Sequence, residues 1–99
     1  MDITMTRNGN ALTAAPAGRL DTTTAPEFEN ALKEACAGVT ELTLDLENLD
    51  YISSAGLRVL LTTHKRMLKQ GSMKLCHVNE IVMDIFEVTG FSDILTIER

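Results

Sequence analysis

Two short stretches in the middle of the chain alternate hydrophobic and polar residues, and a period of two is typical of β-strands. In the first stretch, residues 42–46, three leucines alternate with Thr43 and Asp45. The second stretch, SMKLCHV, predicts a strand over residues 73–78. The connection between them is long enough to hold a helix, so we expect parallel neighbours or near neighbours. The first strand leads directly into YISSAGL, where the strand pattern changes to a helical one.

Apolar residues recur three and four positions apart in three segments, which predicts amphipathic helices. The first follows Pro26, whose fixed backbone suits a first helical turn, and ends before Gly38. The threonines at 22–24 offer N-cap oxygens ahead of it. The second and longest begins after Gly56, and its pattern ends at Gly71. The third covers EIVMDIFEV, with Asn79 as its N-cap. The apolar side predicted for the second helix consists of Leu57, Leu60, Leu61, His64, Met67 and Leu68.

The N-terminal residues predict a β-hairpin. Segments 2–6 and 10–15 flank RNGN, whose Asn-Gly pair is a strong signal for a tight turn. PAGRLDTTTAP, residues 16–26, has the composition of a loop, and the pattern of the C-terminal DILTIER leaves its element type open. These elements predict an α/β fold in a single domain over residues 1–99, with a small mixed β-sheet that has a parallel core and an N-terminal hairpin, and with helices packed on it.

The charge balance argues against nucleic-acid binding. The 14 acidic and 9 basic side chains give a formal net charge of −5 at pH 7, which repels a polyanion. Arg58, Lys65, Arg66 and Lys69 cluster on one segment, and we interpret them as the solvated face of a helix. No run approaches the roughly 18 apolar residues of a membrane span, and the N-terminus lacks an apolar signal core. We therefore expect no direct nucleic-acid partner, no membrane span and a cytoplasmic location.

The cysteines and histidines show no metal-binding spacing. Cys36 and Cys76 lie far apart and form no Cys-x-x-Cys motif, so we expect buried free thiols rather than a zinc site or a disulfide framework. His64 falls on the apolar side of a predicted helix, and His77 has no neighbouring ligand in the sequence. We expect neither a metal nor a cofactor.

Two adjacent hydroxyls, Ser53 and Ser54, stand where a strand is predicted to enter a helix. Loops at the carboxyl ends of strands tend to present ligands and reactive groups. One serine can serve as a helix N-cap, which contributes about 0.5–2 kcal/mol. A modified serine also fits, because a helix N-terminus tolerates negative charge. Gly56 leaves one side of the serine without a side chain, which would let the active site of another protein approach.

Motifs of intrinsic catalysis are absent from the sequence. There is no Gly-x-Ser-x-Gly elbow, no Walker-type phosphate loop and no Gly-x-Gly-x-x-Gly fingerprint. Neither histidine has an obvious orienting acid in the sequence. The sequence therefore predicts no catalytic residue and a protein that is not an enzyme.

The chain resembles the STAS domain family, in particular the bacterial anti-sigma factor antagonists, over the stretches GRLDTTTAPEFENAL, LTLDLENLDYISSAGLRVLL and GSMKLCHVNEIVMDIFEVTGFSDIL. The resemblance implies a protein that, while unphosphorylated, binds an anti-sigma factor, a serine kinase of the GHKL type, and so releases a sigma factor. Phosphorylation by that kinase would end the complex, and a PP2C-type phosphatase would restore it. ATP and magnesium would belong to the kinase.

The resemblance also assigns roles to individual positions. It places the phosphorylation site at Ser54, two positions before the family's glycine at Gly56, with Ser53 as a second candidate. Gly18 and Asp21 fall on the family's Gly-x-x-Asp loop, which lies beside that site. The implied partner-binding residues are Asp21, Thr22, Ser53, Ser54, Gly56, Arg58 and Thr62.

The chain departs from the family at the serine junction. Many antagonists read Asp-Ser-Ser-Gly or Asp-Ser-Thr-Gly, whereas this chain has Ser53 at the acidic position and Ala55 at the second hydroxyl, which is the modified position in some members. A second role therefore stays open, as a STAS regulatory subunit of a transporter or multiprotein signalling complex that docks without phosphorylation. An acyl-carrier protein is also short and acidic with a modified serine, but it is a helical bundle and conflicts with the predicted strands.

Overall fold

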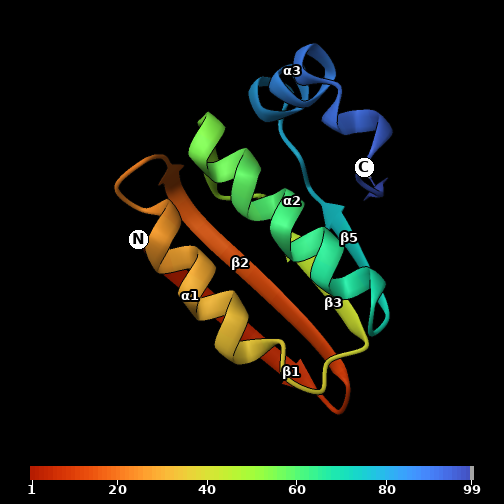
Figure 1. Cartoon of the computed structure of the whole chain (residues 1–99). Helices are drawn as coiled ribbons and strands as arrows, with labels where there is room; N and C mark the ends of the chain where they lie inside the picture. Colours follow the sequence, from red (N-terminus) through yellow and green to blue (C-terminus); the bar gives the residue numbers. More distant parts are fainter. Residues whose placement is uncertain (99) are drawn as a thin grey trace.

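The computed structural model describes residues 1–98, which form a six-stranded β-sheet and three α-helices (Figure 1). The strands are β1 (Asp2–Asn8), β2 (Ala11–Leu20), β3 (Glu41–Asp45), β4 (Leu49–Ile52), β5 (Ser72–Cys76) and β6 (Ile97–Glu98). The helices are α1 (Ala25–Ala35), α2 (Ser54–Leu68) and α3 (Glu80–Thr89), followed by a short 3-10 turn at Phe91–Asp93.

The sheet is mixed. Its strands follow the order β1-β2-β3-β5-β6, and β4 pairs with the second half of β2. β1 and β2 are antiparallel, whereas all other strand pairs are parallel. The predicted mixed sheet with a parallel core and an N-terminal hairpin is confirmed, and the helical bundle of an acyl-carrier protein is excluded.

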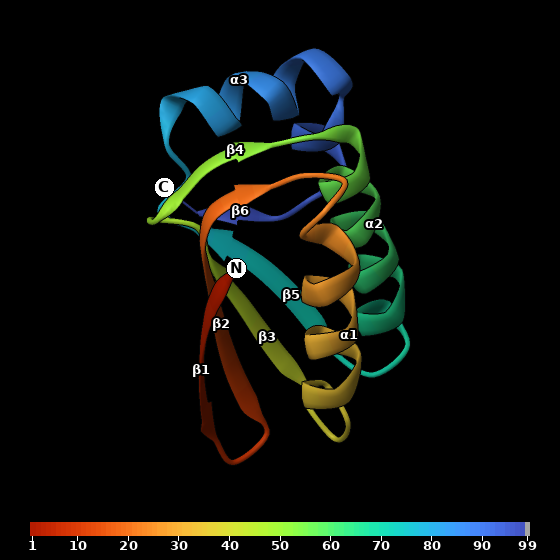
Figure 2. The same cartoon turned by 90° about the vertical axis from the view of Figure 1, so that its left-hand side faces the viewer.

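Helices α1 and α2 lie side by side on one face of the sheet, and α3 packs beyond β4 (Figure 2). The alternation in β3 explains this layering, because successive side chains of a strand point to opposite faces. Leu42 and Leu44 are buried in the core with Phe28 of α1 and Leu60 of α2, whereas Thr43 remains half-buried. The core therefore lies between the two helices and the sheet.

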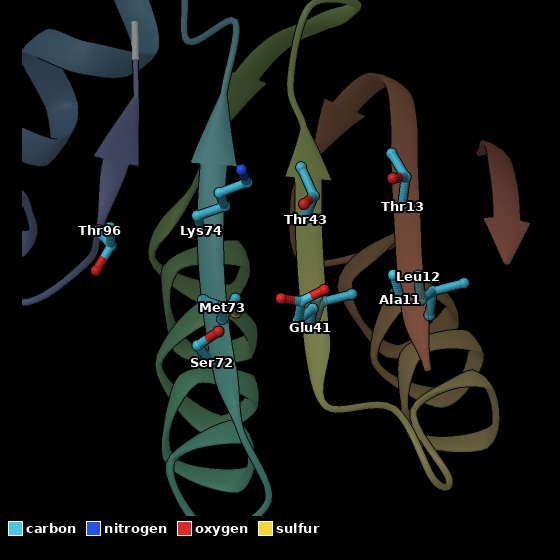
Figure 3. Close-up of a pocket in the computed structure, with 10 residues that line it drawn as sticks. Ala11, Leu12, Thr13, Glu41, Thr43, Ser72, Met73, Lys74 and Thr96 are labelled. Carbon is cyan, nitrogen blue, oxygen red and sulfur yellow. The ribbon is translucent and has the colours of Figure 1, made fainter. Parts of the chain in front are cut away.

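The other face of the sheet carries polar side chains around a shallow hollow (Figure 3). Thr13 of β2, Thr43 of β3 and Lys74 of β5 are partners in the strand register and lie on neighbouring strands there. Glu41 and Thr96 also line the hollow, and both are exposed. In this region the sheet therefore has an apolar face, which the helices cover, and an opposite face that carries hydroxyl and charged side chains.

β2 is longer than the sequence predicts. Residues 16–20 were expected in a loop, but they continue the strand, since they pair with β1 at one end and with β4 at the other. The register of the β2–β4 pair shifts between Gly18 and Arg19, and Gly18 has φ 96°, which glycine adopts without a Cβ clash. This irregularity lets the two halves of β2 pair with different strands. The loop prediction was wrong because proline and glycine also occur at strand irregularities.

The strand predicted over residues 42–46 does not lead directly to the two serines. β3 ends at Asp45, a turn follows, and β4 forms separately. The buried Leu46 holds the turn: its N–H donates to the Cys76 carbonyl at 3.0 Å, and its carbonyl accepts from the Leu49 N–H at 3.1 Å. Leucines are buried both before and after the turn, so the hydrophobic pattern alone does not reveal the break.

The buried side of α2 agrees only in part with the prediction. Leu61 and His64 are half-buried, and Leu68 is 67% exposed. Thr63 is buried instead, and its hydroxyl donates to the Val59 carbonyl at 2.8 Å. The buried side is rotated relative to the predicted one because α2 packs against α1 as well as the sheet. The buried residues of α2 are Gly56, Leu57, Val59, Leu60, Thr63 and Met67.

Helix α3 follows its local signals. The Asn79 side chain accepts from the Val82 N–H at 2.8 Å, which is the predicted N-cap, and the helix ends at Gly90. The element left open at the C-terminus contains the short strand β6. None of the helices in residues 1–98 is long and apolar enough to cross a membrane.

The burial of the cysteines and the contacts of the histidines agree only in part with the prediction. Both cysteines are free, and Cys36 is buried as predicted, but Cys76 is only half-buried. His77 was expected to have no ligand neighbour, yet its Nδ1 lies 3.0 Å from Asp45 Oδ1. The sequence does not reveal this contact because the two residues are 32 positions apart.

Candidate functional site

Two segments of the chain meet at the start of α2. The Ser53 N–H donates to the Leu20 carbonyl at 2.9 Å, which joins the end of β4 to the end of β2. Asp21 follows Leu20 and Ser54 follows Ser53, so the loop after β2 lies beside the first turn of α2. A shallow hollow between α1 and α2 borders this junction. It is lined by Thr22, Ala25, Pro26, Glu29, Ala55, Arg58 and Val59.

The two serines have different environments. Ser54 is the first residue of α2 and is exposed. Ser53 is the N-cap residue by position, and its carbonyl accepts from the Leu57 N–H at 2.9 Å. Its Oγ is buried and has no hydrogen-bond partner within residues 1–98. The side-chain cap that the sequence allowed is therefore not formed by Ser53, and of the two serines Ser54 is the one on the surface.

The start of α2 is suited to negative charge. The first N–H groups of a helix have no acceptor within the helix. The first turn of α2 contains no acidic residue, and the exposed Arg58 lies about one turn beyond Ser54. Such a helix start favours an anion by roughly 0.3–1 kcal/mol at a surface position.

Asp21 organises the loop between β2 and α1. Its Oδ1 accepts from the Thr23 N–H at 3.0 Å, the Thr24 N–H at 3.2 Å and the Thr23 hydroxyl at 2.9 Å. The Thr24 hydroxyl accepts from the Asp21 N–H at 2.9 Å and donates to the Arg19 carbonyl at 2.8 Å. Thr24 is the N-cap of α1 by position but makes no side-chain cap, so the predicted threonine cap is absent. The hydrogen bonds to the carboxylate, that of the Thr23 hydroxyl first, hold the pKa of Asp21 below its ordinary value of 3.8.

Asp21→Asn is expected to destabilise the fold at neutral pH and not in acid. Because the pKa of Asp21 is lowered in the folded state, its charged form adds stability above pH 3.8, and this contribution is lost as the pH falls through the folded pKa. Urea unfolding of the variant and the wild type should therefore differ at pH 7 and converge in acid. Asp50→Asn removes one charge from an exposed position outside the loop and serves as the control. A difference that persists unchanged in acid would contradict the role of the ionised carboxylate.

Arg19 is a charged residue of this region that the sequence did not single out. Its guanidinium carbon lies 4.4 Å from the centroid of the Tyr51 ring, and its Nε lies 4.0 Å from Asp21 Oδ2. Arg19 and Tyr51 are partners in the β2–β4 register. No local signal could have found this contact, because it depends on strand pairing between distant segments.

Four of the residues predicted to bind a partner are exposed around this junction, and we call them the serine surface: Thr22, Ser54, Arg58 and Thr62. Asp21 is half-buried beside them. Thr22 and Arg58 both line the hollow between α1 and α2, and Thr62 lies one turn further along α2. The structure thus brings together side chains from one loop and one helix face.

Gly56 does not belong to the serine surface. It is buried where α2 approaches the sheet, and a Cβ there would lie 2.7 Å from Ile52 Cγ1, 2.8 Å from Leu20 Cγ and 3.0 Å from the Leu20 carbonyl oxygen. The interpretation of Gly56 as an opening for another protein's active site is therefore wrong, whereas its assignment as a partner-binding residue stays a prediction. The missing side chain instead allows α2 to pack closely on β2 and β4.

Comparison with known sequences gives consistent matches. The chain matches the family model of the STAS domain over residues 2–99. It is 36% identical over 99 residues to BtrV of Bordetella bronchiseptica, described as an anti-sigma factor antagonist, covering 98% of this chain and 85% of that protein. It is 31% identical over 98 residues to the anti-sigma-B factor antagonist of Bacillus subtilis, covering 98% of this chain and 90% of that protein.

Comparison with solved structures agrees at the level of the fold. The anti-sigma factor antagonist SpoIIAA in its unphosphorylated form aligns with a TM-score of 0.83 at 16% identity, covering 99% of this chain and 89% of that one. SpoIIAA of Bacillus in its phosphorylated form aligns with a TM-score of 0.75 at 15% identity, covering 99% and 92%. The match over residues 2–99, with relatives above 30% identity along nearly the whole chain, shows that this protein belongs to the STAS domain family, among anti-sigma factor antagonists.

Proposed function

We propose that this protein is an anti-sigma factor antagonist controlled by phosphorylation of Ser54. While unphosphorylated, it binds an anti-sigma factor that is a serine kinase of the GHKL type, and so frees the sigma factor that the kinase holds. Phosphorylation ends this complex, and a PP2C-type phosphatase restores it. The observation that carries the proposal is the exposed Ser54 at the start of α2, beside the Asp21 loop, in a chain whose relatives are anti-sigma factor antagonists.

Exposure favours Ser54 over Ser53 as the phosphate acceptor. A kinase must align the acceptor hydroxyl with the phosphate that it transfers, which requires the hydroxyl to be accessible. Ser53 Oγ is buried, and Ala55 has no hydroxyl. Phosphorylation of Ser53 would require the start of α2 to open, so the exposure of Ser54 supports Ser54 as the acceptor.

A phosphate on Ser54 would change the surface while leaving the fold intact. It adds about −1.5 to −2 charges and three acceptor oxygens. The N–H groups at the start of α2 tolerate this charge, and SpoIIAA supports the same view, because it has this fold in both its unphosphorylated and its phosphorylated form. The added charge would lie beside the ionised Asp21, so an acidic or apolar patch on the partner would meet repulsion where it had met a neutral hydroxyl.

Phosphorylation of the purified protein tests the proposal directly. Incubation with ATP and the anti-sigma kinase encoded near its gene should add one phosphoryl group, which peptide mass spectrometry should locate at Ser54. Ser54→Ala should accept no phosphate, and Ser53→Ala, which removes the neighbouring hydroxyl, should accept it as the wild type does. Phosphate on Ser53, or on neither serine, would contradict the assignment.

Binding to the same kinase provides the second half of the test. Ser54→Asp should retain the circular dichroism spectrum of the wild type, because an acidic residue is favourable at a helix start. It should bind the kinase at least roughly tenfold more weakly, a difference of about 1.4 kcal/mol. Ser54→Ala should bind as the wild type does and resist release by ATP. An aspartate variant that binds normally would count against control by charge at this surface.

The alternative of a docking subunit without phosphorylation rests on the sequence of the junction. Ser53 stands where many family members have aspartate, and Ala55 lacks the second hydroxyl. This role would use the serine surface for binding in a transporter or multiprotein signalling complex. A stable complex that forms without any phosphate transfer would favour it.

A further inference from the structure

Three side chains with metal-ligating atoms meet where β3 and β5 end. Asp45 is the last residue of β3, Cys76 is the last residue of β5, and His77 follows it. Asp45 and Cys76 are direct partners in the parallel β3–β5 register. A carboxylate oxygen, the thiol sulfur and an imidazole nitrogen all lie within 4.8 Å of one another. None of these residues belongs to the serine surface, and the proposed function does not use them.

The backbone and its hydrogen bonds hold the three side chains in place. Asp45 Oδ1 accepts from the Glu47 N–H at 3.1 Å and lies 3.0 Å from His77 Nδ1. His77 has φ 54°, in a region that non-glycine residues seldom adopt. Cys76 is fixed by the β3–β5 pairing on one side and the β5–β6 pairing on the other. The positions of the donor atoms therefore follow from the sheet and from one unusual backbone conformation.

The donor set matches the chemistry of zinc. Zn²⁺ binds thiolate sulfur at about 2.3 Å and imidazole nitrogen or carboxylate oxygen at about 2.0–2.2 Å, in a tetrahedral arrangement. Two such ligands of one ion lie about 3.3–3.8 Å apart. Since the three donor atoms already lie within 4.8 Å of one another, small side-chain rotations would bring them to this spacing. Three protein ligands leave the fourth position for water.

The surrounding charges also favour a cation. Burial and the nearby carboxylates of Asp45, Glu98 and Glu47 raise the pKa of the Cys76 thiol, whereas the Lys74 ammonium lowers it. Glu98 Oε2 lies 3.4 Å from Lys74 Nζ, so its charge is partly compensated. A bound dication would offset the remaining negative charge and stabilise the Cys76 thiolate. The thiol proton would pass to solvent as the metal–sulfur bond forms. Where the imidazole binds through Nδ1, the proton between Nδ1 and Asp45 Oδ1 would move to Nε2 or to solvent, and bonds to the metal would replace that hydrogen bond.

We propose that Asp45, Cys76 and His77 form a Zn²⁺ site that links the end of β3 to the segment between β5 and α3. The sequence led us to expect no metal, because these ligands do not form a sequence motif. The β3–β5 pairing brings them together. It is separate from Ser54, so the outcome of its test does not depend on the proposed switch.

Titration of the untagged, reduced chain with Co²⁺ tests the site. We expect binding of one ion per chain, with thiolate-to-cobalt charge-transfer absorption in the near ultraviolet and the intense visible bands of tetrahedral cobalt. Addition of Zn²⁺ should abolish these bands and raise the midpoint of thermal unfolding, since a ligand that binds the folded state stabilises it. A spectrum without a thiolate band would overturn the proposal.

Variants assign the ligands. Cys76→Ser should lose the thiolate band, and Asp45→Asn and His77→Asn should each weaken Zn²⁺ binding at least tenfold. Asparagine tolerates the positive φ at position 77, so a loss of affinity there would not reflect misfolding, and circular dichroism checks this. Cys36→Ala and His64→Gln remove the other thiol and the other imidazole and should bind as the wild type does. Binding that the three ligand variants leave unchanged would be adventitious and would overturn the proposal.

Discussion

Gly71→Ala is expected to destabilise the fold by about 3 kcal/mol, at the upper end of the usual effect of overpacking. Gly71 lies between α2 and β5, where the chain passes the residue that precedes β3. A Cβ at this position would overlap the Thr40 carbonyl oxygen and lie 2.6 Å from its carbon. These are backbone atoms, so no change of rotamer relieves the overlap. The hydrogen bond from the Ser72 N–H to the Thr40 carbonyl, 2.9 Å long, would have to lengthen or break.

Urea and thermal unfolding, followed by circular dichroism, measure this effect. For a domain of this size 1 kcal/mol corresponds to about 4–8 °C, so the midpoint should fall by about 12–24 °C. Ser72→Ala alters the adjacent, exposed side chain and should stay within about 0.5 kcal/mol of the wild type. A Gly71→Ala protein as stable as this control would show that the connection before β5 relaxes at little cost.

Gly71 shows which structural features a local sequence pattern can predict and which it cannot. The loss of helical periodicity near Gly71 predicts correctly that α2 ends before it, at Leu68. The pattern does not explain why the residue has to be glycine, because the atom in conflict belongs to Thr40, far away in the sequence. The position of a helix end is a local property, whereas the close approach of two backbones is a property of the assembled fold.

Elements with strong local signals were predictable. Helix α3 has its N-cap at Asn79, and the Asn-Gly turn and alternating residues produce the β1–β2 hairpin. The parallel pairing of β3 and β5 follows from two alternating stretches joined by a helix. The first two signals lie within a short window of sequence, and the third needs only two such windows and the helix between them.

The features that were missed all depend on pairing between distant segments. The second half of β2 pairs with β4, which places Arg19 against Tyr51 and buries Gly56. The pairing of β3 with β5 brings Asp45 beside His77. Periodicity shows which side of a strand is apolar, but it does not show which residues of two neighbouring strands lie beside each other.

The candidate site was predictable only with the family resemblance. The residues themselves indicated a serine at a helix start, and they allowed both a cap and a modification. The resemblance placed Asp21 beside that serine, and the hydrogen bond from the Ser53 N–H to the Leu20 carbonyl now accounts for this proximity. The contrast between the exposed Ser54 and the buried Ser53 Oγ arises only in the folded protein, because in sequence the two residues are identical and adjacent.

Gly56→Ala is expected to lower the free energy of unfolding by about 2 kcal/mol and to move the start of α2. Overpacking of a core contact typically costs about 1–3 kcal/mol, and we expect the upper end here because one of the atoms in contact belongs to the backbone. Alanine regains about 1 kcal/mol in helix propensity over glycine, which leaves a net loss of about 2 kcal/mol. The added Cβ would meet Ile52 Cγ1 at 2.7 Å and Leu20 Cγ at 2.8 Å, neither of which is the free end of a side chain. It would also lie 3.0 Å from the Leu20 carbonyl oxygen, which accepts the Ser53 N–H.

That shared oxygen connects the stability of the junction to its function. If α2 moves away from Leu20, the hydrogen bond that joins the Asp21 loop to the start of α2 weakens. Binding to the proposed kinase partner should then weaken together with stability. Binding and urea unfolding are both measured at a temperature where the variant is fully folded without urea. Lys65→Ala, on the exposed face of α2, is the control. Reduced stability with unchanged binding would show that the position of Ser54 does not depend on the packing of Gly56. Unchanged stability would mean that Leu20 and Ile52 yield to the new methyl group, and that glycine is not required for the close approach of α2 to the sheet.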